Sequence, residues 1–479
     1  MIEAAAWVIT VAFSVFAVGI GWTARRKAGA SFTSYAIAGT SLPLVVIAFT
    51  DLSTIMGAGN FIGEAEQGHQ VGYSQLAFVV GEQGAKVAFA LLFAGFAGRF
   101  AYRSLAEMMH DLMLRDNVSR MITAVLTLGL MISWIGGQGL GMGLLFHEFT
   151  GADPTLIIFL FTAIFIAYSA LGGMHAVARV EFVLGILIIV IGIVYYVAAF
   201  KLVDFSPAHL NARLDRAGLS ELTEFHFDLK TLTLFLTGLL GVLGAQSYWQ
   251  RCFAAKDGRS ARRGMLVAGT VATLFVCGTV LVGLVARALN PGGPGDEAMP
   301  WLMANRVPMV ITIVVFALVL IAANGAAAAN LNAATVIIVN DLFTVVRPGM
   351  TDRSMVRAGR LLTVVIGAGG ALAAMYASSI IGLFAQAYTL LACSVVPVLA
   401  LGLLWRRDRS RPFTTGERNC RITPWGARAG LVCGSVTGQL TGLYIGFAAA
   451  VVATVVISLV TRDRSEEPAA DMAVQAIDS

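Results

Sequence analysis

Hydrophobic residues recur along this chain in runs separated by short polar segments that hold most of the charges. A run of about 20 apolar residues has the length that crosses a bilayer as an α-helix. We therefore predict an all-α integral membrane protein with about 13 transmembrane helices. The expected spans are roughly 4–23, 41–64, 73–97, 121–146, 154–171, 180–200, 229–249, 264–288, 308–343, 358–377, 379–404, 427–442 and 444–461.

Two of these spans are interrupted by glycines. The second contains GAGNFIG at 57–63, and the seventh contains TGLLGVLGAQ at 237–246. Glycine-broken spans at matching positions of two five-helix halves indicate an inverted-repeat transporter core with two discontinuous helices, and with its site at the breaks. For either span alone, close helix packing is the alternative explanation, because small residues let membrane helices approach each other.

The distribution of charge predicts the topology. The formal net charge is +5, and most of the 33 Lys and Arg residues fall in loops on one side of the predicted spans. The positive-inside rule assigns that side to the cytoplasm, so we expect a multi-pass protein of the cell membrane with its N-terminus outside and its C-terminus in the cytoplasm. No basic domain is left to bind nucleic acid. The expected partners are the lipid bilayer and a small-molecule solute, and the oligomeric state is not predicted.

The same pattern predicts one membrane domain without a second soluble domain. We expect a peripheral helix and first cytoplasmic loop at 1–40, a ten-helix transport core at 41–405, a basic loop with two C-terminal helices at 406–461, and a cytoplasmic tail at 462–479.

A carboxylate in the second span is the first candidate for chemistry. Asp51 follows Ser41 by a distance of roughly 15 Å along a helix, which places it near the bilayer midplane. A charge there costs about 2.5 kcal/mol or more and is usually functional, so Asp51 is a candidate group for binding a proton, a cation or an amine. The alternative is a structural carboxylate that neighbouring hydroxyls or backbone groups satisfy.

A second charged pair lies in the third span. Glu82 and Lys86 are four residues apart and share a helical face, so we expect them to form an ion pair. The alternative is that Glu82 faces the solute.

Signatures of catalysis are missing from the sequence. The HEFTGADP stretch lacks the second histidine of a zinc protease, and no nucleophile elbow or P-loop is found. We therefore expect no enzyme and no cofactor other than Na⁺ or H⁺ as a coupling ion.

Several stretches together resemble the solute:sodium symporter family, over about residues 30–445. The stretches are AFTDLSTIMGAGNFIG, SWIGGQGLGMG, YSALGGMHAVARVEFV, QRCFAAKDGRSARRG, LNAATVIIVNDLF, and VVPVLALGLLWRR leading into WGARAGLVCGSVTG. The resemblance implies a leucine-transporter-like five-plus-five inverted repeat, alternating access, and inward symport of a small solute.

The resemblance also implies a sodium site that this chain has altered. Carbonyl ligands fall on Ser53, Met56 and Ala322, but the family's two hydroxyl ligands fall on Gly325 and Ala326. Sodium is a hard cation that needs oxygen ligands, and neither side chain offers one. We therefore expect a degraded sodium site and coupling to a proton or to no ion. Asp51 is then the residue that takes over coupling, and Glu181 stands at the family's acidic position in the sixth span.

For the solute, the resemblance places Asn60 and Glu82 near the pocket, with the seventh-span break, including Gly241 and Ala245, on the opposite side. Two acids near the pocket favour a small polar solute that is cationic, amine-bearing or zwitterionic. A transporter-like sensor that signals through a partner protein is the alternative function, because it too would tolerate the loss of the sodium ligands.

Overall fold

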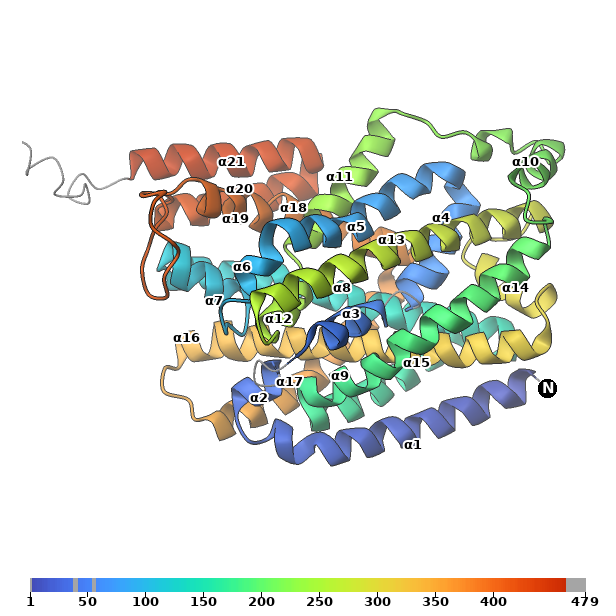
Figure 1. The fold of residues 1–479 in the computed structure, drawn as a ribbon, viewed down its shortest axis with the longest axis horizontal. Helices are drawn as coiled ribbons and strands as arrows, with labels where there is room; N and C mark the ends of the chain where they lie inside the picture. The colour runs from blue at the N-terminus through green and yellow to red at the C-terminus, as the bar shows by residue number, and fades with distance from the viewer. Residues whose placement is uncertain (1, 38–41, 54–56, 462–479) are drawn as a thin grey trace, which may run out of the picture.

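The structure is a computed structural model that describes residues 2–37, 42–53 and 57–461. Throughout these residues the regular secondary structure is helical, as the hydrophobic pattern predicts (Figure 1). The helices are α1 (Ile2–Ala28), α2 (Phe32–Ile37), α3 (Leu44–Leu52), α4 (Glu64–Val71), α5 (Gln75–Phe89), α6 (Gly95–Ala97), α7 (Leu105–Met109), α8 (Asn117–Thr150), α9 (Pro154–Lys201), α10 (Pro207–Arg216), α11 (Leu229–Leu243), α12 (Gln246–Phe253), α13 (Gly258–Leu289), α14 (Ala298–Asn305), α15 (Met309–Ile337), α16 (Thr344–Val346), α17 (Asp352–Tyr376), α18 (Ile380–Ala392), α19 (Val395–Leu404), α20 (Pro424–Thr441) and α21 (Leu443–Val460).

Within the described residues, 11 helices are long and apolar enough to cross a membrane. The expected number of about 13 is therefore not confirmed. The difference arises because α3 is only nine residues long, so the second span does not qualify on its own, and because α20, which contains Arg428, is not among the helices that are apolar enough.

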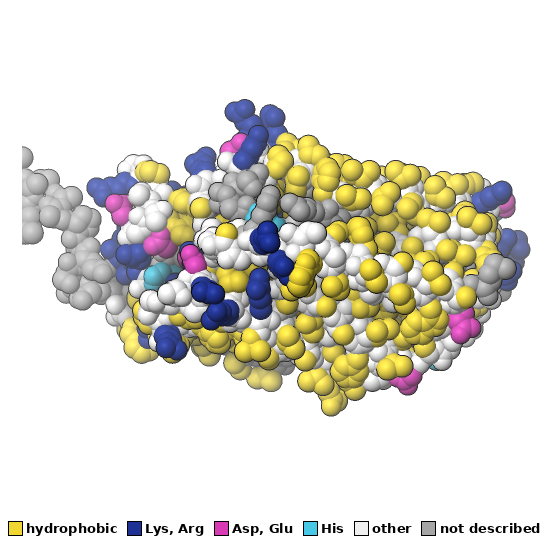
Figure 2. All heavy atoms as spheres, turned by 90° about the horizontal axis from the view of Figure 1, so that it is seen from below, with side chains coloured by type: hydrophobic (Ala, Val, Ile, Leu, Met, Phe, Trp, Pro, Cys, Tyr) yellow, Lys and Arg dark blue, Asp and Glu magenta, His cyan; other side chains and the backbone are white. Residues whose placement is uncertain are grey.

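The long helices run side by side along the longest axis of the molecule (Figure 1). The short helices α10 and α14 lie at the end that holds the N-terminus, and α16 lies at the opposite end. Hydrophobic side chains cover much of the surface between the two ends, and many of the Lys and Arg side chains gather toward one of them (Figure 2). This is the surface expected of a bundle that crosses a bilayer.

The predicted break in the second span is present. Helix α3 ends at Leu52, with the Ser53 amide bonded to the Phe49 carbonyl at 3.0 Å, and a π-helical turn starts at Gly59 and leads into α4. The amide of Ala58, just before this turn, donates to Oε1 of Gln138 on α8 at 2.7 Å. A side chain of a neighbouring helix therefore satisfies a backbone donor where the chain re-enters the helix.

The seventh span breaks as predicted, but at one glycine instead of three. Helix α11 ends at Leu243 with Gly244 as its C-cap, Ala245 is extended, and α12 begins at the next residue. The indole Nε1 of Trp249 donates to the carbonyl of Leu243 at 2.9 Å, so a carbonyl at the end of α11 finds a partner. Gly238 lies inside α11, where an added Cβ would lie 2.7 Å from the Glu82 amide nitrogen. Close packing thus accounts for Gly238.

A third break was not predicted. The apolar run at 379–404 looks continuous in sequence, but α18 ends at Ala392 and α19 begins at Val395. Ser394 between them has non-helical backbone angles, and Pro397 in the first turn of α19 lacks an amide hydrogen to donate to the preceding turn.

Candidate functional site

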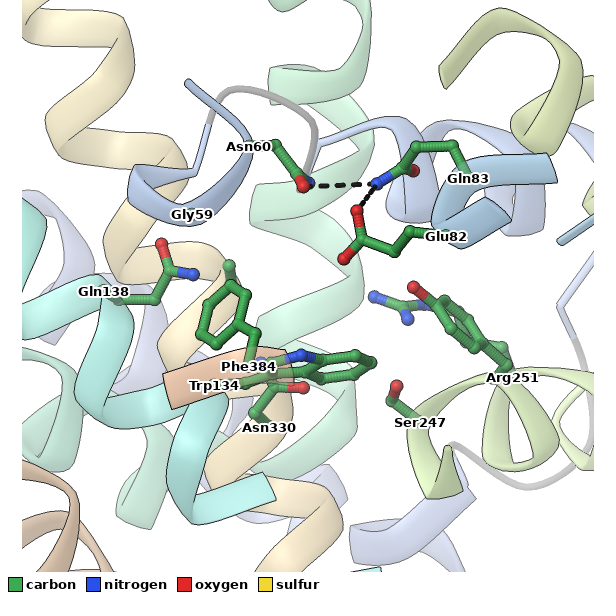
Figure 3. Close-up of a pocket in the computed structure, with 12 residues that line it drawn as sticks. Gly59, Asn60, Glu82, Gln83, Trp134, Gln138, Ser247, Arg251, Asn330 and Phe384 are labelled. Atoms are coloured by element: carbon green, nitrogen blue, oxygen red, sulfur yellow. Dashed lines mark hydrogen bonds between the residues drawn. The ribbon is translucent and has the colours of Figure 1, made fainter. Parts of the chain in front are cut away.

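A narrow cavity lies between the two predicted breaks. It has a volume of about 40 Å³, room for only a few water molecules. Its wall combines polar side chains with aromatic rings, as Figure 3 shows. The lining residues are Gly59, Asn60, Glu82, Gln83, Trp134, Gln138, Ser247, Tyr248, Arg251, Ala326, Asn330 and Phe384.

A chain of hydrogen bonds fixes one wall of this cavity. Nε2 of Gln83 donates to Oδ1 of Asn60 at 3.2 Å and to Oε2 of Glu82 at 2.7 Å (Figure 3). The other Glu82 oxygen accepts a hydrogen bond from the hydroxyl of Tyr388, whose oxygen accepts in turn from Nε1 of Trp134 at 3.1 Å. The first break, α5, α8 and α18 are therefore joined around Glu82 by polar contacts.

Four buried charges lie beside the cavity. Nζ of Lys86 is 2.9 Å from Oδ2 of Asp51, and Nη1 of Arg251 is 3.6 Å from Oδ1 of the same carboxylate. Nη2 of Arg251 is 3.4 Å from Oε1 of Glu181 and 3.3 Å from the carbonyl oxygen of Thr50. The two acids are fully buried, and the Lys86 and Arg251 side chains are 1% and 4% exposed. Within this network of four, two cations face two carboxylates, so each buried charge has a partner of opposite sign.

The expected ion pair between Glu82 and Lys86 is wrong. Lys86 turns instead to Asp51 on α3, and Glu82 faces Tyr388 and the cavity. The helical spacing brings Glu82 and Lys86 to one face, but the amine lies 2.9 Å from the carboxylate of Asp51, which comes from another helix. The alternative from the sequence, Glu82 at the solute cavity, agrees with the geometry.

The two residues expected on the opposite side do not line the cavity. Gly241 packs against Tyr388: an added Cβ would lie 2.6 Å from the Cα atom of that residue. Ala245 is fully buried at the break itself. Their contribution is therefore to let α11 approach α18 and to let the backbone turn, while Ser247, Tyr248 and Arg251 supply the lining from α12.

The residues of the expected sodium site meet a different neighbourhood. Gly325 faces Glu181 and Leu184: an added Cβ would be 3.9 Å from Cγ of the first and 3.6 Å from Cδ1 of the second. Ala326 lines the cavity and Ala322 is buried. The hydroxyl of Ser53 donates to the Thr50 carbonyl at 2.8 Å. Met56 lies outside the described residues.

Arg251 is the charged residue that the sequence analysis missed. The predicted seventh span stops at residue 249, which leaves Arg251 in a basic loop. In the structure α12 continues to Phe253, and all eight of its residues are buried. Gln246 anchors this helix: its Oε1 accepts from the Leu105 amide at 2.8 Å and its Nε2 donates to the Arg103 carbonyl at 3.1 Å. The glycine break could have indicated the position of Arg251, because a helix of two turns that follows the break can still lie inside the bundle.

The model of the sodium:solute symporter family matches residues 35–411. The chain belongs to this family. The sodium/pantothenate symporter of Haemophilus influenzae is 25% identical over 415 residues, which cover 82% of this chain and 83% of that protein. The sodium/sialic acid symporter NanT of Aliivibrio fischeri is 21% identical over 431 residues, with 84% and 83% covered. These relatives are symporters and not enzymes, so a multi-pass transporter of a small solute is confirmed.

Solved structures of transporters share the fold. A sodium-coupled sialic acid symporter in a substrate-bound, outward-open state superposes with a TM-score of 0.78 at 15% identity, over 95% of this chain and 98% of that chain. MHP1, a nucleobase-cation-symport-1 family transporter, superposes with a TM-score of 0.57 at 15% identity, over 88% and 92%. The expected transporter fold is therefore confirmed.

Proposed function

We propose that this protein is a secondary active transporter that imports a small polar solute by alternating access, without sodium at the family's usual site. The observation that carries the proposal is the cavity between the α3 and α11 breaks, with a carboxylate and amide side chains turned into it. Discontinuous helices that meet near the middle of a bundle are where transporters of this architecture bind their solutes. Because the cavity is narrow, a solute would enter only in a wider conformation.

Arg251 supports the coupling part of the proposal. Its guanidinium contacts the Thr50 carbonyl at the end of α3 and Glu181, which itself faces Gly325. A fixed positive charge therefore lies beside the place where the family pattern puts the sodium ion. A second cation there would be repelled, and it would find no hydroxyl at 325 or 326 to bind it. We propose that Arg251 supplies the positive charge permanently, and that coupling uses a proton at Asp51 or no ion.

The lining favours an amine-bearing or zwitterionic solute. Glu82 and Asn60 offer oxygen acceptors at one wall, and Arg251 and Gln138 offer donors from other helices. Relatives named for pantothenate, proline and sialic acid show that solutes differ widely among similar chains. We propose the solute class from the cavity alone. The proposed orientation places the N-terminus outside and the basic end in the cytoplasm.

The first experiment imposes sodium and proton gradients separately on proteoliposomes that contain the protein. A panel of labelled amino acids and betaines is offered after a thermal-shift screen has selected the binders. We expect uptake that a proton gradient increases or that no gradient changes, and that is the same in sodium and in potassium. Sodium-dependent uptake would contradict the proposed coupling. Binding without any uptake would favour the solute sensor.

A second experiment restores the missing ligands. The space at 325 admits a Cβ without a close contact, so Gly325→Ser fits. We expect the triple variant Gly325→Ser, Ala326→Thr, Arg251→Gln to be stabilised by sodium relative to potassium, because ligand binding to the folded state raises the unfolding midpoint. The wild type and Arg251→Gln alone serve as controls that sodium leaves unchanged. Sodium stabilisation of the wild type would overturn the role given to Arg251.

A further inference from the structure

A basic pocket lies away from the solute cavity, where α13 begins. It has a volume of about 530 Å³ and is lined by Gly95, Arg99, Gly258, Arg259, Arg262, Arg263 and Leu266. Three of its four arginines lie within the first two turns of α13, and Arg99 comes from the chain just after α6. A Cβ on Gly258 would lie 2.5 Å from the carbonyl oxygen of Gly95, so Gly258 lets the two segments come together at the floor of the pocket.

The four guanidinium groups have no acidic partner within the part of the chain that the structure describes. Among the described residues, no carboxylate lies within 4.0 Å of any of them. The neighbouring acid is Asp257, whose carboxylate accepts from the Ser260 amide at 2.6 Å and caps its own helix. By contrast, Arg120 and Arg428 elsewhere in the bundle bind Asp341 and Asp116. The pocket therefore concentrates positive charge that no ion pair among the described residues compensates.

Guanidinium groups from two segments suit a phosphate. Arginine presents its donors as a planar fork that matches phosphate oxygens, and several such groups around one pocket can bind one anion from different sides. Arg259, Arg262 and Arg263 stand at helical spacing on neighbouring faces of α13. Arg99 lines the same pocket beside Gly258, where an added Cβ would lie 3.6 Å from its Cγ atom.

The surface beside the pocket is apolar and exposed. Val267 and Leu274 on α13 are 46% and 73% exposed, and Leu91 and Leu92, on the π-helical turn between α5 and α6, are 54% and 65% exposed. Val267 and Leu274 follow Arg263 on the same face of α13 at intervals of four and seven residues. A ligand with a phosphate in the pocket would thus have hydrocarbon-compatible surface leading toward the middle of the membrane.

We propose that this pocket binds the phosphate of an anionic phospholipid in the leaflet at the basic end of the molecule. Basic pockets between transmembrane helices at the cytoplasmic side are suited to anionic headgroups. The apolar strip favours a lipid over a free phosphate ion, because only the lipid has acyl chains to cover it. The proposal depends on the fold and on the membrane orientation, and it stands whether or not the coupling ion is sodium.

The test compares two charge-matched variants of the full chain in detergent. Arg262→Gln/Arg263→Gln removes two charges from the pocket, and Arg353→Gln/Arg357→Gln removes two exposed arginines from the start of α17, near the same end. Phosphatidylglycerol, phosphatidylcholine and inorganic phosphate are the probes. Retained lipid is counted by native mass spectrometry, and the unfolding midpoint is followed as each probe is added.

For the wild type we expect retention of phosphatidylglycerol and a rise of the midpoint with that lipid alone. In the pocket variant the affinity should fall by roughly fivefold for each arginine removed, while the α17 variant behaves as the wild type. Unchanged elution and an unchanged midpoint without lipid show that the pocket variant is folded. Equal loss in both variants, equal binding of phosphatidylcholine, or displacement of the lipid by inorganic phosphate would each overturn the proposal.

Discussion

Paired arginines are held differently at the helix breaks and at the basic end of the bundle. At the basic end, Arg428 donates to the two oxygens of Asp116 at 2.9 and 2.6 Å, and Arg120 donates to Asp341 at 2.8 Å. At the breaks, the Arg251 guanidinium lies 3.3–3.6 Å from oxygen atoms of Thr50, Asp51 and Glu181. Short, charge-assisted bonds fix a geometry, whereas longer contacts bind more weakly and leave the group freer to change partners.

This contrast indicates that the arginines have different structural roles in the two regions. The tight pairs join α8 to the chain after α15 and to α20, so they hold helix ends in one arrangement. The loose contacts of Arg251 join α12, which lines the cavity, to α3 and to α9. Alternating access requires those elements to move relative to each other, and a guanidinium shared between two carboxylates and a carbonyl can follow such a movement.

The largest expected effect is the removal of Arg251. Arg251→Gln leaves two buried carboxylates with only Lys86 as a cation, so we expect the free energy of unfolding to fall by about 3–5 kcal/mol. Arg428→Gln, at a pair that is partly exposed, should lower it by about 1 kcal/mol or less. Unfolding midpoints of both variants in detergent check the difference. The double variant Arg251→Gln/Glu181→Gln should recover part of the loss, and a larger effect at Arg428 would break the comparison.

The next prediction concerns transport. Asp51→Asn keeps a side-chain oxygen but cannot take up a proton, so the variant should lose gradient-driven accumulation while it retains solute exchange across the membrane. Asp116→Asn, the matched change at the basic end, should keep both activities. Counterflow and net uptake in the same proteoliposomes separate the two. Full concentrative uptake by Asp51→Asn would show that this carboxylate takes no part in coupling.

The sequence predicted the architecture well because hydrophobic length and glycine placement act locally. Runs of apolar residues, the break before Gly59 and the break at Gly244 follow from bilayer thickness and from backbone freedom, so they are visible without a structure. The break at Ser394 was missed because an apolar run hides it. The surface helix α10 shows the reverse case: it begins with Ser206 as its cap and Pro207 in its first turn, a pattern that is local and easy to read.

The candidate site was less predictable because its pairings are tertiary. Asp51 and Glu82 stood out as intramembrane acids, but their partners come from α5, α12 and α18, which are distant in sequence. The spacing of Glu82 and Lys86 suggested an ion pair, but in the folded protein Lys86 pairs with Asp51 from another helix. Gln83, Gln138 and Asn330 carried no sequence signal, since a polar residue in a membrane helix shows its orientation only when the helices are packed.

A steric prediction tests whether the central region also depends on close helix approach. Gly241→Ala would bring a Cβ to 2.6 Å from the Tyr388 backbone, which also positions the hydroxyl on Glu82. We expect a loss of about 1–3 kcal/mol from overpacking. Gly84→Ala on α5 is the control, because nothing lies within 4 Å of the added atom. Equal unfolding midpoints for the two variants would show that α11 and α18 can move apart without a loss of stability.

The smallest effect is expected at Asp116, and it depends on pH. Burial alone would raise the pKa of Asp116, but hydrogen bonds from Arg428 and Ser119 lower it to about 2. A lowered pKa stabilises the folded state above the usual carboxyl value of about 3.9, and this contribution is lost as the pH falls toward 2. Asp116→Asn keeps a good helix cap, so the variant isolates the charge.

At neutral pH we therefore expect Asp116→Asn to unfold more easily by about 1 kcal/mol or less, since the pair is partly solvated. The difference from the wild type should narrow below pH 4 and vanish near pH 2, as measured by unfolding midpoints across that range. Asp204→Asn, at an exposed carboxylate beside His209, should match the wild type throughout. If the difference in unfolding midpoint stayed constant at all pH values, the contact between Asp116 and Arg428 would stabilise the fold by packing and not by charge. The basic end would then differ from the Arg251 site in side-chain packing and not in electrostatics.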